Sequence, residues 1–257
     1  MTHPRLPDRD ASPVRLPHAP LPTYYQSNDA SKREAFLRRI FDAAAVDYDR
    51  LEKIVGLGTG SWYRRQALLR AGLKPGLQVV DVGMGTGLVS REILRITGEP
   101  HRLVGVDPSP GMMGQAHFEQ PVECRLGRAE DIPVPDASAD FVVMGYALRH
   151  IADFSAAADE FRRVLKPGGQ LLILEITRPE GRLGHALLKA YMRGVVPLLA
   201  RAVSRAKDTP MLWRYYWDTI EACVPPQQVM QTLTGSGLLE VERHVELNIF
   251  SEYRARG

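Results

Sequence analysis

The residues best suited to chemistry are an acid and three glycines, which alternate with other residues in the stretch 79–87, VVDVGMGTG. β-Branched residues followed by glycines are typical of a buried strand that ends in a tight loop. The pattern of residues 88–95, LVSREILR, favours a helix directly after this loop. Glycine allows positive φ angles and lets a ligand approach the main chain, because it has no Cβ. A purely structural turn between strand and helix is the alternative.

A second acid lies where a ribose could be bound. Residues 101–107, HRLVGVD, predict another strand that ends in Asp107, about 20 residues beyond the glycines, where a carboxylate accepts hydrogen bonds from ribose hydroxyls. Asp81, inside the first strand, favours a ligand with an ammonium group and would repel a pyrophosphate. These features predict S-adenosylmethionine rather than NAD as the cofactor. The predicted cofactor loop comprises Asp81, Gly83, Met84, Gly85, Thr86 and Gly87.

The segments after Asp107 offer contacts for an adenine ring. Pro108 opens a short predicted helix in which Met112 is placed to pack on the adenine face. Packing in the core explains Met112 equally well, because methionine is a general gap-filler. A third predicted strand and its loop follow over residues 121–133, with the candidate adenine neighbours Ala129, Glu130 and Asp131.

The strand predicted from residue 139 carries a polar cluster at its carboxyl end, formed by Tyr146, Arg149 and His150. If the acceptor is a phenol or hydroquinone, a neutral His150 could take the hydroxyl proton, because its unperturbed pKa of about 6.5 suits a general base. Arg149 could then stabilise the phenolate. The alternative is that both residues only tie this loop to its neighbours.

Two helical segments flank these elements. Residues 31–75 predict an N-terminal lid over the cofactor loop, and Tyr48, Tyr63 and Arg65 are its candidates for binding the methionine carboxylate. Residues 180–235 predict a cap rich in aromatic residues that encloses an apolar or aromatic substrate. The candidate substrate contacts in the cap are Tyr191, Trp213 and Tyr216.

The same cap carries basic residues, namely Arg182, Lys189, Arg193, Arg201, Arg205 and Lys207. A solvated face is the first interpretation, and contact with a membrane surface or a substrate phosphate is the second.

Strands alternate with helices from Val79 to Thr177, which predicts an α/β fold with a parallel sheet, and residues 238–255 predict an antiparallel closing pair. The ligand in such a sheet lies at the carboxyl ends of the strands. Residues 31–257 are predicted to form one domain. Residues 1–30 are rich in proline and predict a disordered tail.

Composition excludes several classes of function. The formal charge of +3 is mild and predicts no nucleic-acid surface. Two distant cysteines, Cys124 and Cys223, predict neither a disulfide framework nor a metal site. No apolar run reaches the length of a transmembrane segment, and no signal peptide is visible, so we expect a cytoplasmic protein. The sequence leaves open whether the chain forms a homodimer.

Four stretches resemble the class I S-adenosylmethionine-dependent methyltransferases, and more narrowly the ubiquinone/menaquinone biosynthesis C-methyltransferase family. They are residues 41–49 (FDAAAVDYD), 127–135 (GRAEDIPVP), 146–153 (YALRHIAD) and 164–175 (VLKPGGQLLILE). The resemblance implies a Rossmann-like fold with a seven-stranded, mostly parallel sheet whose last strand is antiparallel. It also implies that the loop glycines and Asp107 bind the cofactor, with Ala129 beside the adenine. Arg128 stands where the family usually has an acid, so Glu130 or Asp131 would accept from the adenine amino group.

These observations predict a small-molecule methyltransferase that converts S-adenosylmethionine to S-adenosylhomocysteine in quinone or natural-product biosynthesis. C-methylation of an aromatic, quinol or prenylated acceptor is the first hypothesis. Methylation of nitrogen or oxygen in a specialised metabolite is the second, and a non-catalytic S-adenosylmethionine-binding scaffold is the third.

Overall fold

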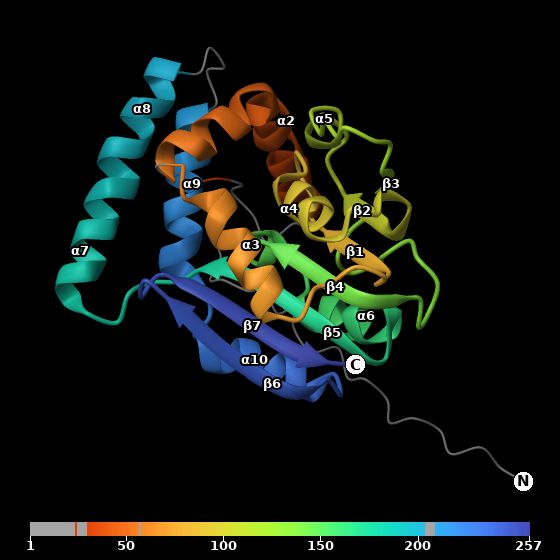
Figure 1. Ribbon diagram of the computed structural model, residues 1–257. Coiled ribbons are helices and arrows are strands. Elements are labelled where there is room, and N and C mark those ends of the chain that lie inside the picture. The colour runs from red at the N-terminus through yellow and green to blue at the C-terminus, as the bar shows by residue number, and fades with distance from the viewer. Residues whose placement is uncertain (1–23, 25–29, 57, 204–208) are drawn as a thin grey trace, which may run out of the picture.

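A computed structural model gives the fold, and the structure describes residue 24 and residues 30–56, 58–203 and 209–257. Its centre is a sheet of seven strands in the order β3-β2-β1-β4-β5-β7-β6. Strands β1 to β5 are parallel, and β7 is antiparallel to both of its neighbours (Figure 1). The strands are β1 (Val79–Val82), β2 (Leu103–Asp107), β3 (Glu123–Leu126), β4 (Ala139–Gly145), β5 (Leu165–Ile176), β6 (Leu239–Glu246) and β7 (Phe250–Arg256). The predicted α/β class and the antiparallel last strand are confirmed.

Helices cover both faces of the sheet. Alternate residues of β1 point to opposite sides, so Val80 and Val82 join one core and Val79 joins the other. The first core is closed by α6 (Phe154–Val164) and α10 (Pro226–Gly235), and the second by α3 (Gly60–Arg70) and α4 (Leu88–Thr97). Three short elements lie at strand ends: η1 (Pro100–Arg102), α5 (Pro110–Met113) and η2 (Leu148–His150).

The predicted lid and cap pack together in a third core. The lid helix α2 contributes Ile40 and Leu51, and the cap helix α9 contributes Trp213 and Trp217. Because these side chains are buried against one another, α2 and the cap form one covering over the sheet. The helices are α2 (Ala30–Val55), α7 (Arg182–Ala190), the π turn η3 (Tyr191–Val195), α8 (Val196–Val203) and α9 (Thr209–Ala222).

One part of the predicted layout differs from the structure, and another lies outside the described residues. The predicted cap of residues 180–235 included α10, but Val229 and Leu233 of α10 belong to the core of the sheet. The predicted tail of residues 1–30 lies outside the described residues except for Tyr24 and Ala30. Tyr24 donates a hydrogen bond of 2.5 Å to Asp218 of α9, so this residue packs on the cap.

Within the part of the chain that the structure describes, no helix combines the length and the apolar character needed to cross a membrane.

Candidate active site

A cavity of about 350 Å³ lies at the carboxyl ends of β1, β2 and β4, beneath α2 and α9. Sixteen of the residues predicted for the site line its wall, and five do not reach it. Those on the wall are Tyr48, Tyr63, Gly83, Met84, Gly85, Thr86, Asp107, Pro108, Met112, Ala129, Glu130, Tyr146, His150, Tyr191, Trp213 and Tyr216. Those off the wall are Arg65, Asp81, Gly87, Asp131 and Arg149.

The glycine loop between β1 and α4 adopts a backbone that few other residues could follow. Gly83 has φ +71°, and a Cβ there would lie 2.7 Å from the Cβ of Ala147. Gly87 has φ +83°, and a Cβ there would meet the ring of Phe118 at 2.7 Å. Gly87 therefore allows α4 to begin close to Phe118, whereas Gly83 lies on the cavity wall.

Asp107 ends β2 with both carboxylate oxygens directed at the glycine loop and its own turn. Oδ2 accepts from the Gly85 N–H and Oδ1 from the Ser109 N–H, each at 2.8 Å. Burial raises the pKa of Asp107 to about 6, against the opposing effect of these two hydrogen bonds. Each oxygen can accept one more donor, so a ligand with adjacent hydroxyls fits this carboxylate.

Asp81 lies behind the loop rather than on the cavity. Its side chain is fully buried, and Oδ2 accepts a hydrogen bond of 2.6 Å from Ser90 of α4. Burial raises the pKa of Asp81 to about 7, although the Ser90 hydrogen bond acts in the opposite direction. The position does not fit the expected direct contact between this carboxylate and a ligand ammonium group.

The residues predicted to lie beside an adenine occupy different positions. Met112 and Ala129 are buried on the cavity wall. Glu130 also lines the cavity, but its Oε1 accepts from the backbone N–H groups of Ala152 and Asp153 at 2.6 and 3.1 Å. Glu130 therefore holds the loop after η2, with Oε2 as its remaining acceptor. Asp131 is exposed and does not line the cavity.

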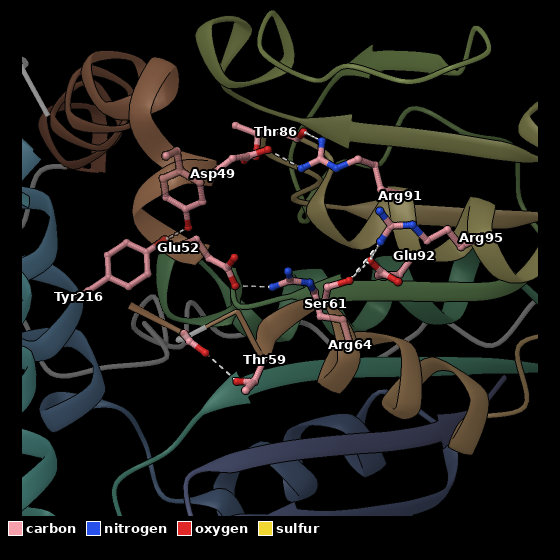
Figure 2. Close-up of polar contacts among 12 residues, drawn as sticks. Asp49, Glu52, Thr59, Ser61, Arg64, Thr86, Arg91, Glu92, Arg95 and Tyr216 are labelled. Carbon is pink, nitrogen blue, oxygen red and sulfur yellow. Dashed lines mark hydrogen bonds and ion pairs between the residues drawn. The ribbon is translucent and has the colours of Figure 1, made fainter. Parts of the chain in front are cut away.

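On α3, the arginine that reaches the cavity is the neighbour of the predicted one. Arg65 is exposed, whereas Arg64 is buried, lines the cavity and forms an ion pair of 2.6 Å with Glu52 of α2 (Figure 2). Tyr63 lies beside it and stacks on Phe250 of β7 at 4.5 Å between ring centroids.

Asp49 of α2 fixes the cofactor loop, and the sequence analysis missed it. The hydroxyl of Thr86 and the guanidinium of Arg91 both donate to Asp49, and Arg91 Nη1 donates to the Thr86 carbonyl at 2.8 Å (Figure 2). Asp42 of the same helix accepts from the Ser109 hydroxyl at 2.5 Å. Asp42 and Asp49 are seven residues apart, about two helical turns, so their placement on one face of the helix was readable from the sequence.

His150 of η2 lies on the cavity wall among aromatic rings. Its ring meets Phe41 edge to face at 5.1 Å between centroids and stacks on Tyr215 at 5.6 Å. Arg33, another residue that the sequence analysis missed, donates to the carbonyl oxygens of His150 and Ile151 at 3.1 and 3.0 Å. The lid helix therefore fixes the backbone that carries the imidazole.

Arg149 lies beneath the cavity, in a fully buried ion pair with Glu175 of β5. The distance from Arg149 Nη1 to Glu175 Oε1 is 2.5 Å, and the guanidinium carbon lies 5.3 Å from the centroid of the Tyr216 ring. The predicted direct contact with a phenolate does not fit this position. Tyr146 does line the cavity, and its φ of +60° is unusual for a residue with a side chain.

The predicted substrate contacts in the cap line the part of the cavity that lies beneath the cap. The hydroxyls of Tyr48 and Tyr216 share a hydrogen bond of 2.6 Å, which joins α2 to α9. Burial raises the pKa of Tyr48 to about 12 and also raises the pKa of Tyr216 well above its ordinary value, so both hydroxyls are neutral at physiological pH. Tyr191 donates to the Val55 carbonyl at 2.7 Å. Trp213 Nε1 is buried without a hydrogen-bond partner among the described residues.

Comparison with known proteins identifies the family of the chain. A model of the ubiE/COQ5 methyltransferase family matches residues 28–247. The chain belongs to the ubiE/COQ5 methyltransferase family. This confirms the resemblance seen in the sequence, and it makes the chain an S-adenosylmethionine-dependent methyltransferase.

Relatives within the family include two bacterial proteins. Demethylmenaquinone methyltransferase of Symbiobacterium thermophilum is 27% identical over 229 residues, which cover 85% of this chain and 90% of the relative. The ubiquinone/menaquinone biosynthesis C-methyltransferase UbiE of Rubrivivax gelatinosus is 30% identical over 222 residues, 86% of each chain. Among solved structures, a SAM-dependent methyltransferase of Thermotoga maritima matches the fold with a TM-score of 0.59. It is 22% identical, and the match covers 86% of this chain and 99% of that one.

The geometry of this family member fits S-adenosylmethionine. Asp107 presents a buried carboxylate with free acceptor capacity beside the glycine loop, and Met112 and Ala129 offer an apolar surface next to it. Arg64 supplies a buried cation on the same wall, with Nε not hydrogen-bonded to any described residue. A ribose, an adenine and a carboxylate can therefore each find a complementary group.

Proposed function

We propose that the chain transfers the methyl group of S-adenosylmethionine to a ring carbon of a lipophilic aromatic, quinol or prenylated acceptor. One observation carries the proposal. The cofactor loop and the imidazole of His150 line the same cavity, and aromatic side chains of the cap enclose it. The names of the relatives, which include quinone C-methyltransferases, support the same substrate class.

The cofactor is assigned to the part of the cavity beside β1 and β2. Asp107 would accept the ribose hydroxyls through the free acceptor capacity of its two oxygens, and Glu130 Oε2 would accept from the adenine amino group. The methionine carboxylate would pair with Arg64, with Tyr63 beside it, because a charged head group needs charged donors in a buried site.

The acceptor is assigned to the part of the cavity beneath the cap. Tyr191, Trp213 and Tyr216 present rings that can pack against an aromatic or prenyl group. Trp213 Nε1, which has no hydrogen-bond partner within the described residues, would donate to an acceptor oxygen.

When bound, S-adenosylmethionine supplies an electrophilic methyl group on a sulfonium. His150 would remove the proton of the acceptor hydroxyl, which raises the electron density of the ring carbon that bonds the methyl group as the methyl–sulfur bond breaks. The hydrogen of that carbon would then leave as a proton and return to the hydroxyl oxygen, so that the ring becomes aromatic again. Arg33 holds the His150 backbone in place, and α2 with the cap keeps water away from the reacting atoms. Arg149 acts as a positioning residue, since it contacts the Tyr216 ring rather than the cavity.

Methylation of an acceptor oxygen or nitrogen is the second candidate. It uses the same cofactor site and the same His150, but the proton removed would come from the atom that is methylated. The non-catalytic scaffold is the weakest hypothesis, because the family is one of methyltransferases.

Turnover with methyl-labelled S-adenosylmethionine tests the proposal. The purified chain is incubated with demethylated quinols, prenylated phenols and amines, and mass spectrometry locates the label in each product. We expect the label on a ring carbon of a quinol or phenol. Label on oxygen or nitrogen alone would contradict C-methylation and leave the methyltransferase assignment intact. Asp131→Asn serves as a control variant that should give the same product as the unchanged chain, because Asp131 is exposed and lies off the cavity.

A further inference from the structure

The helices α7 and α8 and the π turn η3 between them present large apolar side chains to the outside. Leu183 is 75% exposed, Leu187 63%, Val195 45% and Leu198 66%. Figure 1 shows α7 and α8 end to end along one edge of the molecule, with α9 on their inner side. Exposed leucines this dense on one element mark a surface that is covered in use.

Basic side chains accompany these leucines. Arg182, Lys189, Arg193 and Arg201 are all exposed, and residues 182–203 contain no Asp or Glu. The acids of the adjacent helix α9 are already engaged, since Asp218 accepts from Tyr24 and Glu221 lies 3.0 Å from His185. The outer face therefore combines apolar groups with charge of one sign.

The π turn η3 aligns the two halves of this surface. In a straight α-helix, Arg201 would lie roughly 100° around the axis from Arg182. A π turn adds one residue, which rotates the following helix back by about 100°. Arg201 thus returns to the side of Arg182, and the basic side chains form one stripe beside the leucines.

The opposite face of the same helical segment forms part of the cavity wall. Leu188, Tyr191 and Met192 line the cavity, while Leu187 and Arg193, their neighbours in sequence, are exposed. One layer of helix thus separates the cavity from the exposed surface.

We propose that the outer face of α7, η3 and α8 docks on the surface of an anionic lipid bilayer. Leu183, Leu187, Val195 and Leu198 enter the boundary between headgroups and acyl chains, and the basic residues contact anionic headgroups. A symmetric contact with a second copy is disfavoured, because it would bring together two basic stripes that carry no acid over residues 182–203. Where the proposed function holds, docking places the acceptor cavity one helix away from a membrane-dissolved acceptor.

Co-sedimentation of the full chain with vesicles tests this proposal without any acceptor or turnover, so its outcome is independent of the proposed function. We expect binding to vesicles of equal parts phosphatidylcholine and phosphatidylglycerol, weak binding to pure phosphatidylcholine, and release by salt. Two double variants should each bind vesicles tenfold or more weakly. One is Leu183→Gln with Leu187→Gln, and the other is Arg182→Gln with Lys189→Gln. Each basic residue near the surface contributes roughly fivefold to binding.

Matched controls replace exposed residues elsewhere. Leu126 and Leu247 are 63% and 71% exposed, and their change to Gln should leave vesicle binding unchanged. Lys53→Gln with Lys74→Gln is the corresponding charge control, because both lysines are exposed. Thermal unfolding of every variant checks that it is folded.

Three outcomes would overturn the proposal. They are equal binding to neutral and anionic vesicles, full binding by the patch variants, and no binding at all. Light scattering without lipid tests a fourth outcome. If the chain forms a dimer and the leucine changes dissociate it, this face would be assigned to a second copy.

Discussion

Arg64 of α3 and Glu52 of α2 form an ion pair on the cavity wall, with 2.6 Å between Arg64 Nη1 and Glu52 Oε1 (Figure 2). The pair joins the two helices of the lid, and Arg64 Nε is buried without a hydrogen-bond partner among the described residues. A cation that is held by one carboxylate and still has a donor available is suited to binding a second carboxylate.

The neighbouring arginines provide a matched test of this role. Arg64→Gln should weaken S-adenosylhomocysteine binding about tenfold or more, because a charge-assisted hydrogen bond contributes roughly 1.5–3 kcal/mol. Arg65→Gln should change the dissociation constant little, because Arg65 is exposed. Isothermal titration calorimetry measures both, with thermal unfolding as the check on folding. Equal effects of the two changes would contradict the assignment.

Asp107→Asn should weaken S-adenosylhomocysteine binding by roughly a hundredfold, since two hydrogen bonds from ribose hydroxyls to a carboxylate contribute about 3 kcal/mol together. The wild-type affinity should also fall as the pH drops through about 6, where Asp107 takes up a proton and loses acceptor capacity. The variant should lack this pH dependence. Calorimetry across the pH range checks both effects, and an unchanged affinity in Asp107→Asn would rule out the ribose contact.

His150→Gln should lower kcat about a hundredfold or more, because general base catalysis contributes roughly 10²–10⁴ in rate. Binding of S-adenosylhomocysteine should not change, since the proposed role of His150 is toward the acceptor and not toward the cofactor. Steady-state kinetics and calorimetry separate these effects. A variant with normal turnover would show that His150 only packs among Phe41, Tyr215 and Tyr216.

Arg149→Met should destabilise the fold by about 3–5 kcal/mol, because it leaves the buried carboxyl of Glu175 without its partner. The double variant Arg149→Met, Glu175→Leu should recover most of this free energy of unfolding, since it removes both buried charges. Denaturant unfolding of the single and double variants measures the coupling. Additive losses would mean that the two residues do not depend on each other.

Asp81 should make the protein less stable as the pH rises. Its pKa is raised by burial to about 7 in the folded state from the ordinary value of 3.8, so folding takes up a proton between these values. Ionisation of Asp81 costs no stability below about pH 4, where the carboxyl is protonated in both states. Above about pH 7 the cost is complete, and it lowers the free energy of unfolding by roughly 4 kcal/mol. Asp107, whose charge also raises the pKa of Asp81, titrates in the same range and is present in both proteins, so the comparison reports Asp81 together with its coupling to Asp107.

Asp81→Asn, which cannot ionise, should therefore show a smaller fall in the free energy of unfolding between pH 5 and pH 8.5 than the wild type. Denaturant unfolding at both pH values tests this. Parallel pH profiles for the two proteins would show that Asp81 does not carry the buried charge.

Much of the fold followed from local patterns. The β-branched run before the glycines predicted β1, and the alternation of strands and helices predicted the parallel sheet, because these periodicities arise within a few residues. The limits of the cap were wrong, since α10 has an apolar face that fits the sheet as well as it would fit a cap.

The residues proposed to hold the cofactor were more predictable than those proposed to hold the acceptor. Gly83, Gly85 and Asp107 come from one strand-loop-helix unit and the next strand, so their spacing in the sequence nearly fixes their spacing in space. Asp49, Glu52 and Arg33 were missed, because the sequence shows which residues share a face of a long helix but not which face meets the cavity.

The sequence by itself determined the fold class, the family and the position of the glycine loop. Only the tertiary structure decided which side chains face the cavity. Successive helical residues differ by about 100° around the axis, so the choice between Arg64 and Arg65 depends on how α3 packs on the sheet. Similarly, the ion pair with Glu175 of β5 holds Arg149 beneath the cavity wall. A hydrogen bond joins Tyr48 to Tyr216, which is 168 residues further along the sequence. Contacts between distant segments set these orientations, and no local pattern encodes them.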